Sequence, residues 1–246
     1  MSHEHGSLTK QRQKVGKSKA PAARGIHPIL PIGTCFSPLE ATIQQLWATV
    51  VPLGESSTPS RILFTCAHGG EGTTTIATCT AIGLARHWHG GVLLLEADSS
   101  GGGLAADLDQ SPSPGLVEVM CGEAAFKEAL RPTDVPGLEV LPTGREPGES
   151  PGEFSPDAFG VILEKAIRSG RQVIVDGPPL LDSPFTRLLL RHCDGAVVVI
   201  EAGRTRHESV QGAIQAINEL GVPILGTVLN RYRPEVPRWI SPQPLH

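Results

Sequence analysis

Residues 66–75, CAHGGEGTTT, form the stretch of sequence that decides the fold. An apolar run, RILFT at 61–65, precedes it, and a run with helical character, IATCTAIGLARHW at 76–88, follows it. Glycines between a buried strand and a helix are typical of a phosphate-binding loop in the style of G-x-x-x-x-G-K-[ST]. Thr73, however, stands where that pattern has its lysine. The stretch predicts a strand, a glycine-rich loop and a helix, and it leaves open whether the loop still binds phosphate.

Beyond this stretch, short apolar runs alternate with segments of helical character. The runs are RILFTCA at 61–67, VLLLEA at 92–97, LEVLPT at 138–143, QVIVD at 172–176, GAVVVIE at 195–201 and PILGTVLN at 223–230. Helices are expected near 73–88, 115–130, 155–169, 183–193 and 206–220, the last beginning with a capping box at 205–208. Continuous apolar runs suit strands that are buried on both faces. The sequence therefore predicts an α/β fold, a doubly wound, mostly parallel sheet flanked by helices.

Composition favours a single folded domain. A chain of 246 residues with 39% hydrophobic content can bury one good core. Residues 1–33 are basic, polar and punctuated by glycine and proline, which predicts a disordered tail, with docking on an anionic membrane face as the alternative. The domain is then expected over 34–246. The net charge of −4 gives no overall attraction to nucleic acid, so no nucleic-acid partner is expected.

Other signals concern the cellular compartment. No apolar run reaches the roughly 18 to 20 residues of a membrane span, and the first residues lack the apolar core of a signal peptide. We therefore expect a cytoplasmic protein. The cysteines are odd in number and scattered, which favours reduced, mostly buried thiols: Cys35, Cys66, Cys79, Cys121 and Cys193.

Two kinds of residue could carry chemistry. In the loop, Gly69, Gly70 and Gly72 would let backbone N–H groups converge on phosphate oxygens, and Thr74 has the position of a magnesium-binding hydroxyl. Acidic residues also follow two strands: Glu96, Asp98 and Asp176. The carboxyl ends of neighbouring parallel strands face the crevice where such sheets bind ligands. Hard carboxylate oxygens at that place suit magnesium.

A serial set of motifs resembles a known family. The segments are CAHGGEGTTTIA, VLLLEAD, GLVEVMCGEAAFKEAL, DVPGLEVLPTG, VIVDGPPLLDSP, CDGAVVVIEAGRTR and PILGTVLNRYRP. In order and spacing they resemble the cytoplasmic domain of bacterial tyrosine kinases (BY-kinases), which belong to the MinD/ParA-like P-loop ATPases. The resemblance covers about residues 37–234. It implies ATP or ADP with Mg²⁺, control of capsule or exopolysaccharide assembly, and a partner that is a membrane chain-length regulator or polysaccharide export protein.

The resemblance also assigns residues. It implies nucleotide binding by Gly69, Gly70, Glu71, Gly72, Thr73, Thr74, Thr75, Asn230 and Arg231, with Asn230 near the adenine. It implies magnesium ligation by Thr74, Glu96, Asp98 and Asp176, and catalytic roles for Asp98 and Asp176 if the chain is active.

The departures from the family are as informative as the match. Thr73 replaces the lysine that contacts the β- and γ-phosphates in the family, and His68 stands where the MinD/ParA relatives carry an extra lysine. Glu96 replaces an aspartate, and the predicted helix at 38–53 lacks the family's arginines. Tyr232 is the single tyrosine, where autophosphorylating members have a cluster, and we expect it to be a packing residue.

Three hypotheses follow. The first is a non-catalytic or weakly catalytic regulator that docks on a membrane partner or an active kinase, at the inner face of the membrane, with nucleotide as a structural ligand. The second is an active tyrosine kinase or ATPase in which Arg204, Arg206 or a residue supplied by another molecule replaces the lysine. The third is a MinD/ParA-like spatial organiser that dimerises over ATP. Self-association is an open expectation in each of them.

Overall fold

The computed structural model describes residues 60–99, 111–145 and 157–232. The predicted tail at 1–33 and the predicted helix at 38–53 lie outside the described residues, so the domain limits remain predictions. The strands are β1 (Arg61–Cys66), β2 (Val92–Glu96), β3 (Arg131–Pro132), β4 (Leu138–Leu141), β5 (Gln172–Asp176), β6 (Gly195–Glu201) and β7 (Ile224–Asn230). The helices are α2 (Thr73–Ala85), α4 (Leu116–Met120), α5 (Phe126–Ala129), α6 (Ala158–Arg168), α7 (Pro184–Leu190) and α8 (His207–Glu219).

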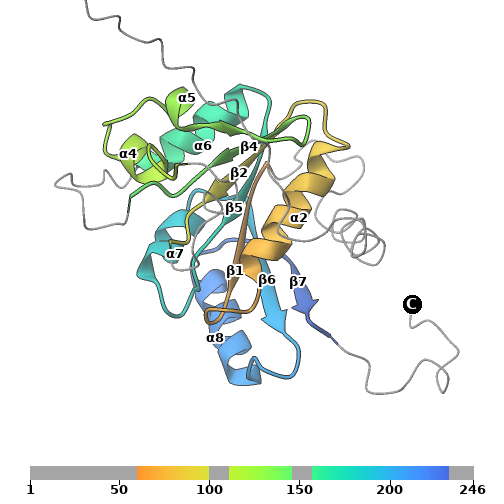
Figure 1. Ribbon diagram of the computed structural model, residues 1–246. Coiled ribbons are helices and arrows are strands. Elements are labelled where there is room, and N and C mark those ends of the chain that lie inside the picture. The colour runs from red at the N-terminus through yellow and green to blue at the C-terminus, as the bar shows by residue number, and fades with distance from the viewer. Residues whose placement is uncertain (1–59, 100–110, 146–156, 233–246) are drawn as a thin grey trace, which may run out of the picture.

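The strands form one seven-stranded sheet in the order β3-β4-β2-β5-β1-β6-β7 (Figure 1). All neighbouring pairs are parallel except β3 with β4. The chain builds the sheet outward from β1 on both sides, since β5 and β2 lie to one side and β6 and β7 to the other. The doubly wound α/β prediction is therefore confirmed. Ligands of such sheets bind beyond the carboxyl ends of the strands, close to the point where the winding reverses.

Helices cover both faces of the sheet (Figure 1). On one face, Ile76 and Ile82 of α2 pack with Ile62 and Phe64 of β1. On the other face, α4, α6, α7 and α8 pack against the alternate strand residues, with Phe159 of α6 in that core. Because strand side chains alternate between the faces, strands buried on both sides need apolar residues throughout, which is the pattern in the sequence.

Two local predictions are wrong, and one short strand was not expected. The helix expected at 115–130 is two short helices, α4 and α5, separated by a turn in which Gly122 has a φ of 73°. The unexpected strand is the antiparallel β3. The capping box at 205–208 does not form, because Arg206 is the N-cap residue of α8 and makes no side-chain cap hydrogen bond. The Thr205 hydroxyl instead accepts a hydrogen bond from the backbone N–H of Glu201, at 3.0 Å.

Candidate functional site

The glycine-rich loop joins β1 to the N-terminus of α2, as the sequence predicts. Gly70 and Gly72 have φ values of 88° and 90°, a left-handed conformation that glycine adopts at little cost. Gly72 is the N-cap residue of α2, which has no side-chain cap and no acidic residue in its first turn. The first N–H groups of a 13-residue helix therefore lack a side-chain acceptor at the helix start. This arrangement suits an anion such as phosphate.

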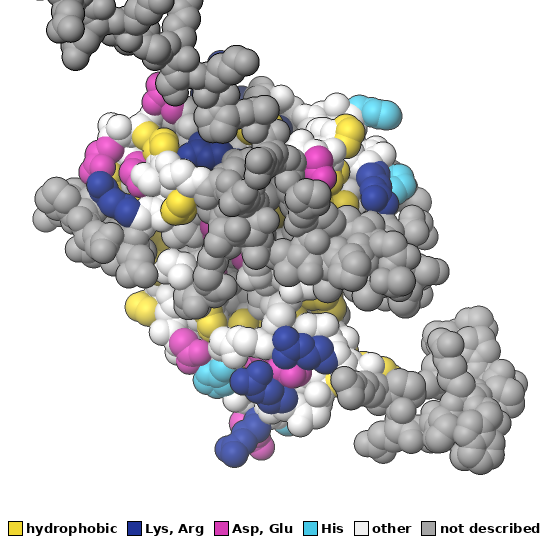
Figure 2. All heavy atoms as spheres, viewed as in Figure 1, with side chains coloured by type: hydrophobic (Ala, Val, Ile, Leu, Met, Phe, Trp, Pro, Cys, Tyr) yellow, Lys and Arg dark blue, Asp and Glu magenta, His cyan; other side chains and the backbone are white. Residues whose placement is uncertain are grey.

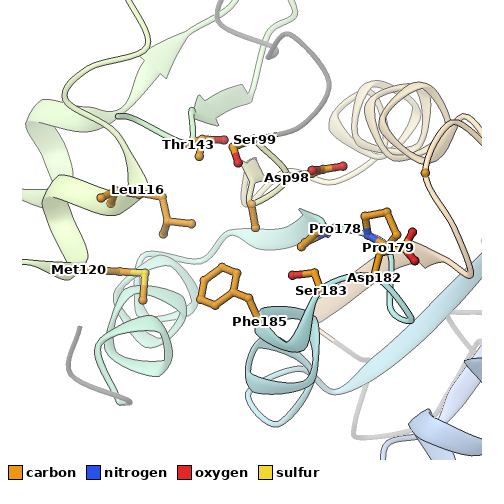
Figure 3. A pocket seen from close by; sticks show the side chains of 13 residues that line it. Asp98, Ser99, Leu116, Met120, Thr143, Pro178, Pro179, Asp182, Ser183 and Phe185 are labelled. Carbon is orange, nitrogen blue, oxygen red and sulfur yellow. The ribbon is translucent and has the colours of Figure 1, made fainter. Parts of the chain in front are cut away.

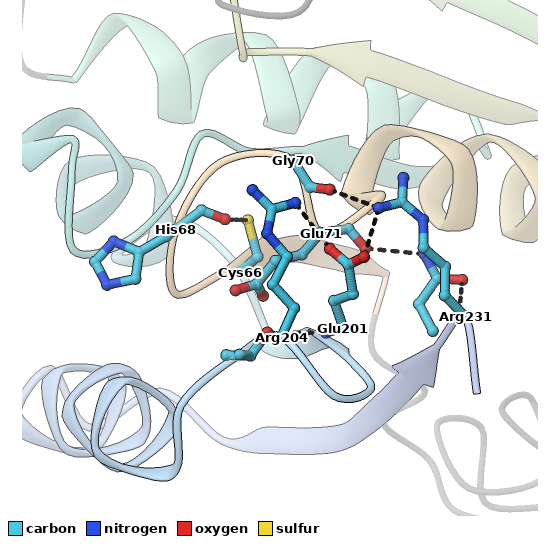
Figure 4. Close-up of polar contacts among 9 residues, drawn as sticks. Cys66, His68, Gly70, Glu71, Glu201, Arg204 and Arg231 are labelled. Atoms are coloured by element: carbon cyan, nitrogen blue, oxygen red, sulfur yellow. Dashed lines mark hydrogen bonds and ion pairs between the residues drawn. The ribbon is translucent and has the colours of Figure 1, made fainter. Parts of the chain in front are cut away.

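Residues from the ends of β6 and β7 fix the outer side of the loop (Figure 4). Asn230 Nδ2 donates a 2.8 Å hydrogen bond to the carbonyl oxygen of Glu71. Arg231 Nη1 donates to the carbonyl oxygen of Gly70 at 3.1 Å and to Glu201 Oε1 at 2.9 Å. Arg204 Nη1 donates to Glu201 Oε2 at 3.0 Å. The two segments that lie beside the loop thus satisfy two of its carbonyl groups.

The close approach of these side chains explains why glycine is needed. A Cβ atom on Gly72 would lie 2.2 Å from Asn230 Nδ2, and one on Gly70 would lie 3.3 Å from Arg204 Nη1. Any larger residue at position 72 would have to displace Asn230. Arg206, in contrast, has no side-chain hydrogen bond or ion pair with any other residue that the structure describes.

Asp176 lies beneath the loop at the carboxyl end of β5. Its exposed fraction is 1%, and its Oδ1 has no hydrogen-bond partner among the described residues. Burial raises the pKa of Asp176 to about 8, a hydrogen bond with Thr74 opposes the rise, and the charges of Asp98 and Glu96 add to it. A buried, unpaired carboxylate is costly, and a cation at this place would remove the cost. The Thr74 hydroxyl and the carboxylates of Asp176 and Asp98 supply oxygen atoms of the kind that magnesium binds.

Glu96, for which the resemblance implies a metal role, contacts the end of β4. It pairs with Asp176 in the register of β2 and β5 and is 2% exposed. Its Oε2 accepts a 3.1 Å hydrogen bond from the backbone N–H of Thr143, and its carbonyl oxygen accepts one from the Thr143 hydroxyl. At least one oxygen of the Glu96 carboxylate is thus engaged with the end of β4.

Thr73 lies at the first position of α2 and is 7% exposed. Burial raises the pKa of the Cys66 thiol, and the neighbouring Thr73 hydroxyl opposes this rise. Oε2 of the buried Glu71 has no hydrogen-bond partner among the described residues. His68 Nδ1 lies 2.9 Å from Oδ1 of Asp182, and in Figure 4 its ring points away from Gly70. The residues therefore fit a phosphate chain with magnesium, except that the loop itself carries no lysine or arginine between 67 and 85.

A cavity of about 610 Å³ opens beside the loop (Figure 3). Gly69 and Asp98 lie at its polar side, and apolar residues such as Leu116, Met120 and Phe185 form much of its wall. Asp98, which follows β2, and the start of the loop thus border one cavity at the carboxyl end of the sheet. This is the crevice in which α/β folds of this kind bind their ligands.

Two further predictions have clear outcomes. Tyr232 follows β7 and is 59% exposed, so the prediction that it packs into the core is wrong. The cysteines that the structure describes, Cys66, Cys79, Cys121 and Cys193, are free thiols. Cys66 lies under the loop, where burial raises its pKa to about 12. Within the described residues, no helix has the length and apolarity to cross a membrane.

Sequence reasoning named Arg231 as a nucleotide-binding residue and Arg204 as a candidate to replace the lysine, but it did not find Glu201 or the contacts at Gly70. In Figure 2, Lys and Arg side chains gather beside acidic ones at the end of the molecule where α8 lies. The contact between Arg231 and Gly70 joins residues 161 positions apart. The only signal in the sequence was the basic character of AGRTR and NRYR after two strands.

Known proteins resemble this chain both in sequence and in fold. No protein-family model matches the chain. The tyrosine-protein kinase CpsD of Streptococcus agalactiae is 27% identical over 176 residues, which cover 71% of this chain and 76% of the relative. The kinase domain of the Escherichia coli tyrosine kinase ETK superposes with a TM-score of 0.62 at 25% identity, covering 72% of this chain and 71% of that one.

A second structural neighbour is the septum site-determining protein MinD of Pyrococcus horikoshii, solved in complex with Mg-ADP. Its TM-score is 0.58 at 21% identity, and the match covers 70% of each chain. At that identity the likeness shows a shared fold. By sequence this chain is a homologue of the bacterial tyrosine-protein kinases, and its fold is that of their kinase domains and of the MinD/ParA-like P-loop ATPases.

Proposed function

We propose that this chain is a nucleotide-binding regulator of capsule or exopolysaccharide assembly that transfers phosphate slowly or not at all. One observation carries the proposal. Thr73, buried at the start of α2, stands in the position of the lysine that contacts the phosphates in the family it resembles. A loop that keeps its glycines and its acids but loses this cation is suited to holding a nucleotide more than to converting it.

Several features support nucleotide binding. Gly70 and Gly72 keep the conformation of a phosphate-binding loop, and the uncapped N-terminus of α2 attracts anions. Thr74, Asp98 and Asp176 would hold magnesium, with Glu96 turned in part toward Thr143. Magnesium, when bound, neutralises charge on the phosphates. ADP and ATP are therefore the ligands that we expect.

The expected loss is larger for phosphoryl transfer than for binding. A charge-assisted hydrogen bond contributes about 1.5–3 kcal/mol, so losing the lysine would weaken binding by about ten- to a hundredfold. Phosphoryl transfer relies on positioned charge that stabilises the transition state, and it loses more when that charge is removed. A single tyrosine, Tyr232, also gives the chain little to phosphorylate on itself.

The biological setting follows from the family resemblance. On this proposal the chain acts in the cytoplasm at the inner face of the membrane. Its partner is a membrane chain-length regulator, a polysaccharide export protein or an active kinase of the same family, and it self-associates or joins the oligomer of that kinase. Nucleotide then acts as a structural ligand that favours one conformation of the loop.

The test combines binding and turnover. Calorimetry would measure the affinity of the native chain and of Thr73→Lys for ADP and ATP with magnesium, and a phosphate-release assay would compare native turnover with that of Asp176→Ala. We expect weak binding by the native chain, binding ten- to a hundredfold tighter by Thr73→Lys, and native turnover no higher than that of Asp176→Ala. Robust native turnover that Asp176→Ala abolishes would overturn the regulator proposal.

A second candidate is an active tyrosine kinase or ATPase that uses another cation. The position of Arg204 and Arg231 beside Gly70 favours it. The same turnover assay separates the two candidates, since only the second predicts magnesium-dependent turnover that requires Asp176.

A further inference from the structure

Three charged residues, Arg204, Arg231 and Glu201, lie together at the ends of β6 and β7. Arg204 and Arg231 are here called the arginine pair. Each carboxylate oxygen of Glu201 accepts from one arginine, Oε2 from Arg204 at 3.0 Å and Oε1 from Arg231 at 2.9 Å. The carboxylate is 13% exposed, whereas the side chains of Arg204 and Arg231 are 62% and 53% exposed. Glu201 thus holds two accessible guanidinium groups side by side.

Both arginines touch the glycine-rich loop at the same residue (Figure 4). Arg231 Nη1 donates to the carbonyl oxygen of Gly70 at 3.1 Å. The guanidinium of Arg204 lies against the α-carbon of Gly70, because all three of the nearest atoms to a Cβ built there belong to it. These contacts bring two arginine side chains to a loop that has no lysine or arginine of its own between residues 67 and 85.

The charge of the group matches the charge that the loop has lost. Hydrogen bonds and charge from Arg231 and Arg204 lower the pKa of Glu201, which stays ionised at neutral pH. Two arginines and one carboxylate give a net charge of +1, the charge of one lysine. Each guanidinium has five N–H donors in a planar fork that matches phosphate geometry, so donors remain after the contacts with Glu201 and Gly70.

The buried side of the loop needs such a charge. Asp176 is 1% exposed with an unpartnered Oδ1, and its register partner on β2 is the buried Glu96. A phosphate chain beside these acids would meet repulsion unless cations flank it. Magnesium can supply charge beside Asp176 and Thr74, and the arginine pair adds charge next to Gly70.

We propose that Arg204 and Arg231 together bind the phosphate chain of a nucleoside diphosphate or triphosphate seated in the loop, in place of the missing lysine. Glu201 is the positioning residue that holds the two guanidinium groups at the loop. The inference rests on the proposed nucleotide binding, and it deepens that proposal by naming the residues that replace the lysine. Arg206, two positions from Arg204 and without a side-chain partner in the described residues, provides a matched control.

The experiment measures binding by calorimetry in the full-length chain, with ADP, ATP and inorganic tripolyphosphate as probes in the presence of magnesium. The variants are Arg204→Ala, Arg231→Ala, the double variant and Arg206→Ala, each also made with Thr73→Lys. We expect each single loss to weaken ADP and tripolyphosphate binding about tenfold and the double loss about a hundredfold. Arg206→Ala should change affinity less than about twofold.

The Thr73→Lys background tests whether the arginines and the lysine share one role. If they do, Thr73→Lys improves affinity more in the double arginine variant than in the native chain, because the lysine then replaces what was removed. If Thr73→Lys improves affinity by the same factor in both chains, the arginines only stabilise the loop, and the inference is overturned. Circular dichroism and thermal unfolding without ligand would confirm that each variant folds.

Failures of the two proposals can be distinguished. If the native chain binds ADP and the double arginine variant binds it equally well, the arginine inference is overturned while nucleotide binding stands. If Thr73→Lys binds ADP and the native chain does not, the arginines do not replace the lysine, and nucleotide binding by the native chain is also wrong.

Discussion

The side-chain amide of Asn230 determines the path of the loop through a single contact with Glu71. Asn230 Nδ2 donates to the Glu71 carbonyl oxygen at 2.8 Å, across 159 positions of sequence. The other end of the amide, Oδ1, accepts from the backbone N–H of Arg231 at 2.9 Å. Arg231 has a φ of 57°, the only positive value for a described residue other than glycine. The end of β7 is thus shaped to place an amide donor under the loop.

Gly72→Ala should therefore destabilise the protein by more than the cost of placing alanine in the left-handed backbone conformation of Gly72. Its φ of 90° makes alanine unfavourable by about 1–2 kcal/mol. The added Cβ would also displace Asn230 Nδ2 and break a hydrogen bond worth about 1 kcal/mol. We expect a loss of about 2–3 kcal/mol in the free energy of unfolding, measured by urea denaturation.

The control for this prediction is Gly221→Ala. Gly221 has a φ of 70° and no atom within 4 Å of a built Cβ, so alanine there meets the backbone cost alone. Asn230→Ala removes the clash, and in that background Gly72→Ala should cost about as much as Gly221→Ala. An equal cost of Gly72→Ala with and without Asn230 would contradict the proposed role of the contact.

Asp176 should make the stability of the metal-free protein fall as the pH rises. Its pKa is about 8 in the folded chain and about 3.9 in an unfolded one, so between these values the folded state binds more protons. Stability then decreases with pH across this window. The side chain introduced by Asp176→Asn cannot titrate. We therefore expect the free energy of unfolding of Asp176→Asn, relative to that of the native chain, to be higher at pH 8 than at pH 5 by at least about 1 kcal/mol.

The measurement is urea unfolding of both proteins at the two pH values, with chelator and without nucleotide. Other titrating groups cancel in the comparison because both chains contain them. A stability difference between the two chains that is the same at pH 5 and pH 8 would show that Asp176 is already ionised at pH 5.

The sequence predicted the sheet because its signal is strong and local. Six strands are continuous apolar runs, and burial on both faces explains them in all but the edge strand β7, where Leu229 is 54% exposed. The loop was predictable for a related reason, since glycines at 70 and 72 mark backbone that other residues rarely adopt. The short strand β3 gave no signal, because a two-residue strand that contains Pro132 has neither periodicity nor a full set of donors.

Other features depended on contacts that sequence spacing does not reveal. The break between α4 and α5 at Gly122 interrupts a helical pattern that looks continuous in the sequence. Threonine is a common N-cap residue, but the Thr205 hydroxyl instead accepts a hydrogen bond from the backbone N–H of Glu201. The contacts of Arg231 with Gly70 and of Glu96 with Thr143 join residues far apart in sequence, so only the folded chain brings them together.

Glu96 should matter less for metal binding than its sequence position suggests. Its Oε2 accepts from the Thr143 N–H, and glutamine at this position would keep an acceptor for that bond. We expect Glu96→Gln to change magnesium-dependent ADP affinity by less than about threefold, whereas Asp176→Asn should weaken it by tenfold or more. Calorimetry with and without magnesium makes the comparison. Equal losses in both variants would restore Glu96 as a direct ligand.

Asp194 anchors the start of β1 and should contribute strongly to stability. Its Oδ2 accepts from the backbone N–H groups of Ser60 and Arg61 at 2.8 and 2.9 Å, and its Oδ1 accepts from Arg61 Nε at 3.1 Å. Burial acts to raise the pKa of Asp194, but the hydrogen bonds from Arg61 and Ser60 outweigh it and the pKa is lowered. The carboxylate thus stabilises the fold above about pH 4, and this contribution is lost as the pH falls through the folded pKa.

Asp194→Ala should accordingly cost about 2–3 kcal/mol at pH 7, because it leaves two backbone donors and a half-buried guanidinium without their acceptor. Glu164→Ala is the control, since Glu164 pairs with Arg168 on the exposed face of α6 and such pairs contribute less than about 0.5 kcal/mol. The cost of Asp194→Ala should shrink when urea unfolding is repeated near pH 3, because the native carboxylate then approaches protonation and its charge-assisted bonds weaken. A cost that stays constant between pH 7 and pH 3 would mean that Asp194 acts through packing, and that its ionic bonds with the start of β1 add little.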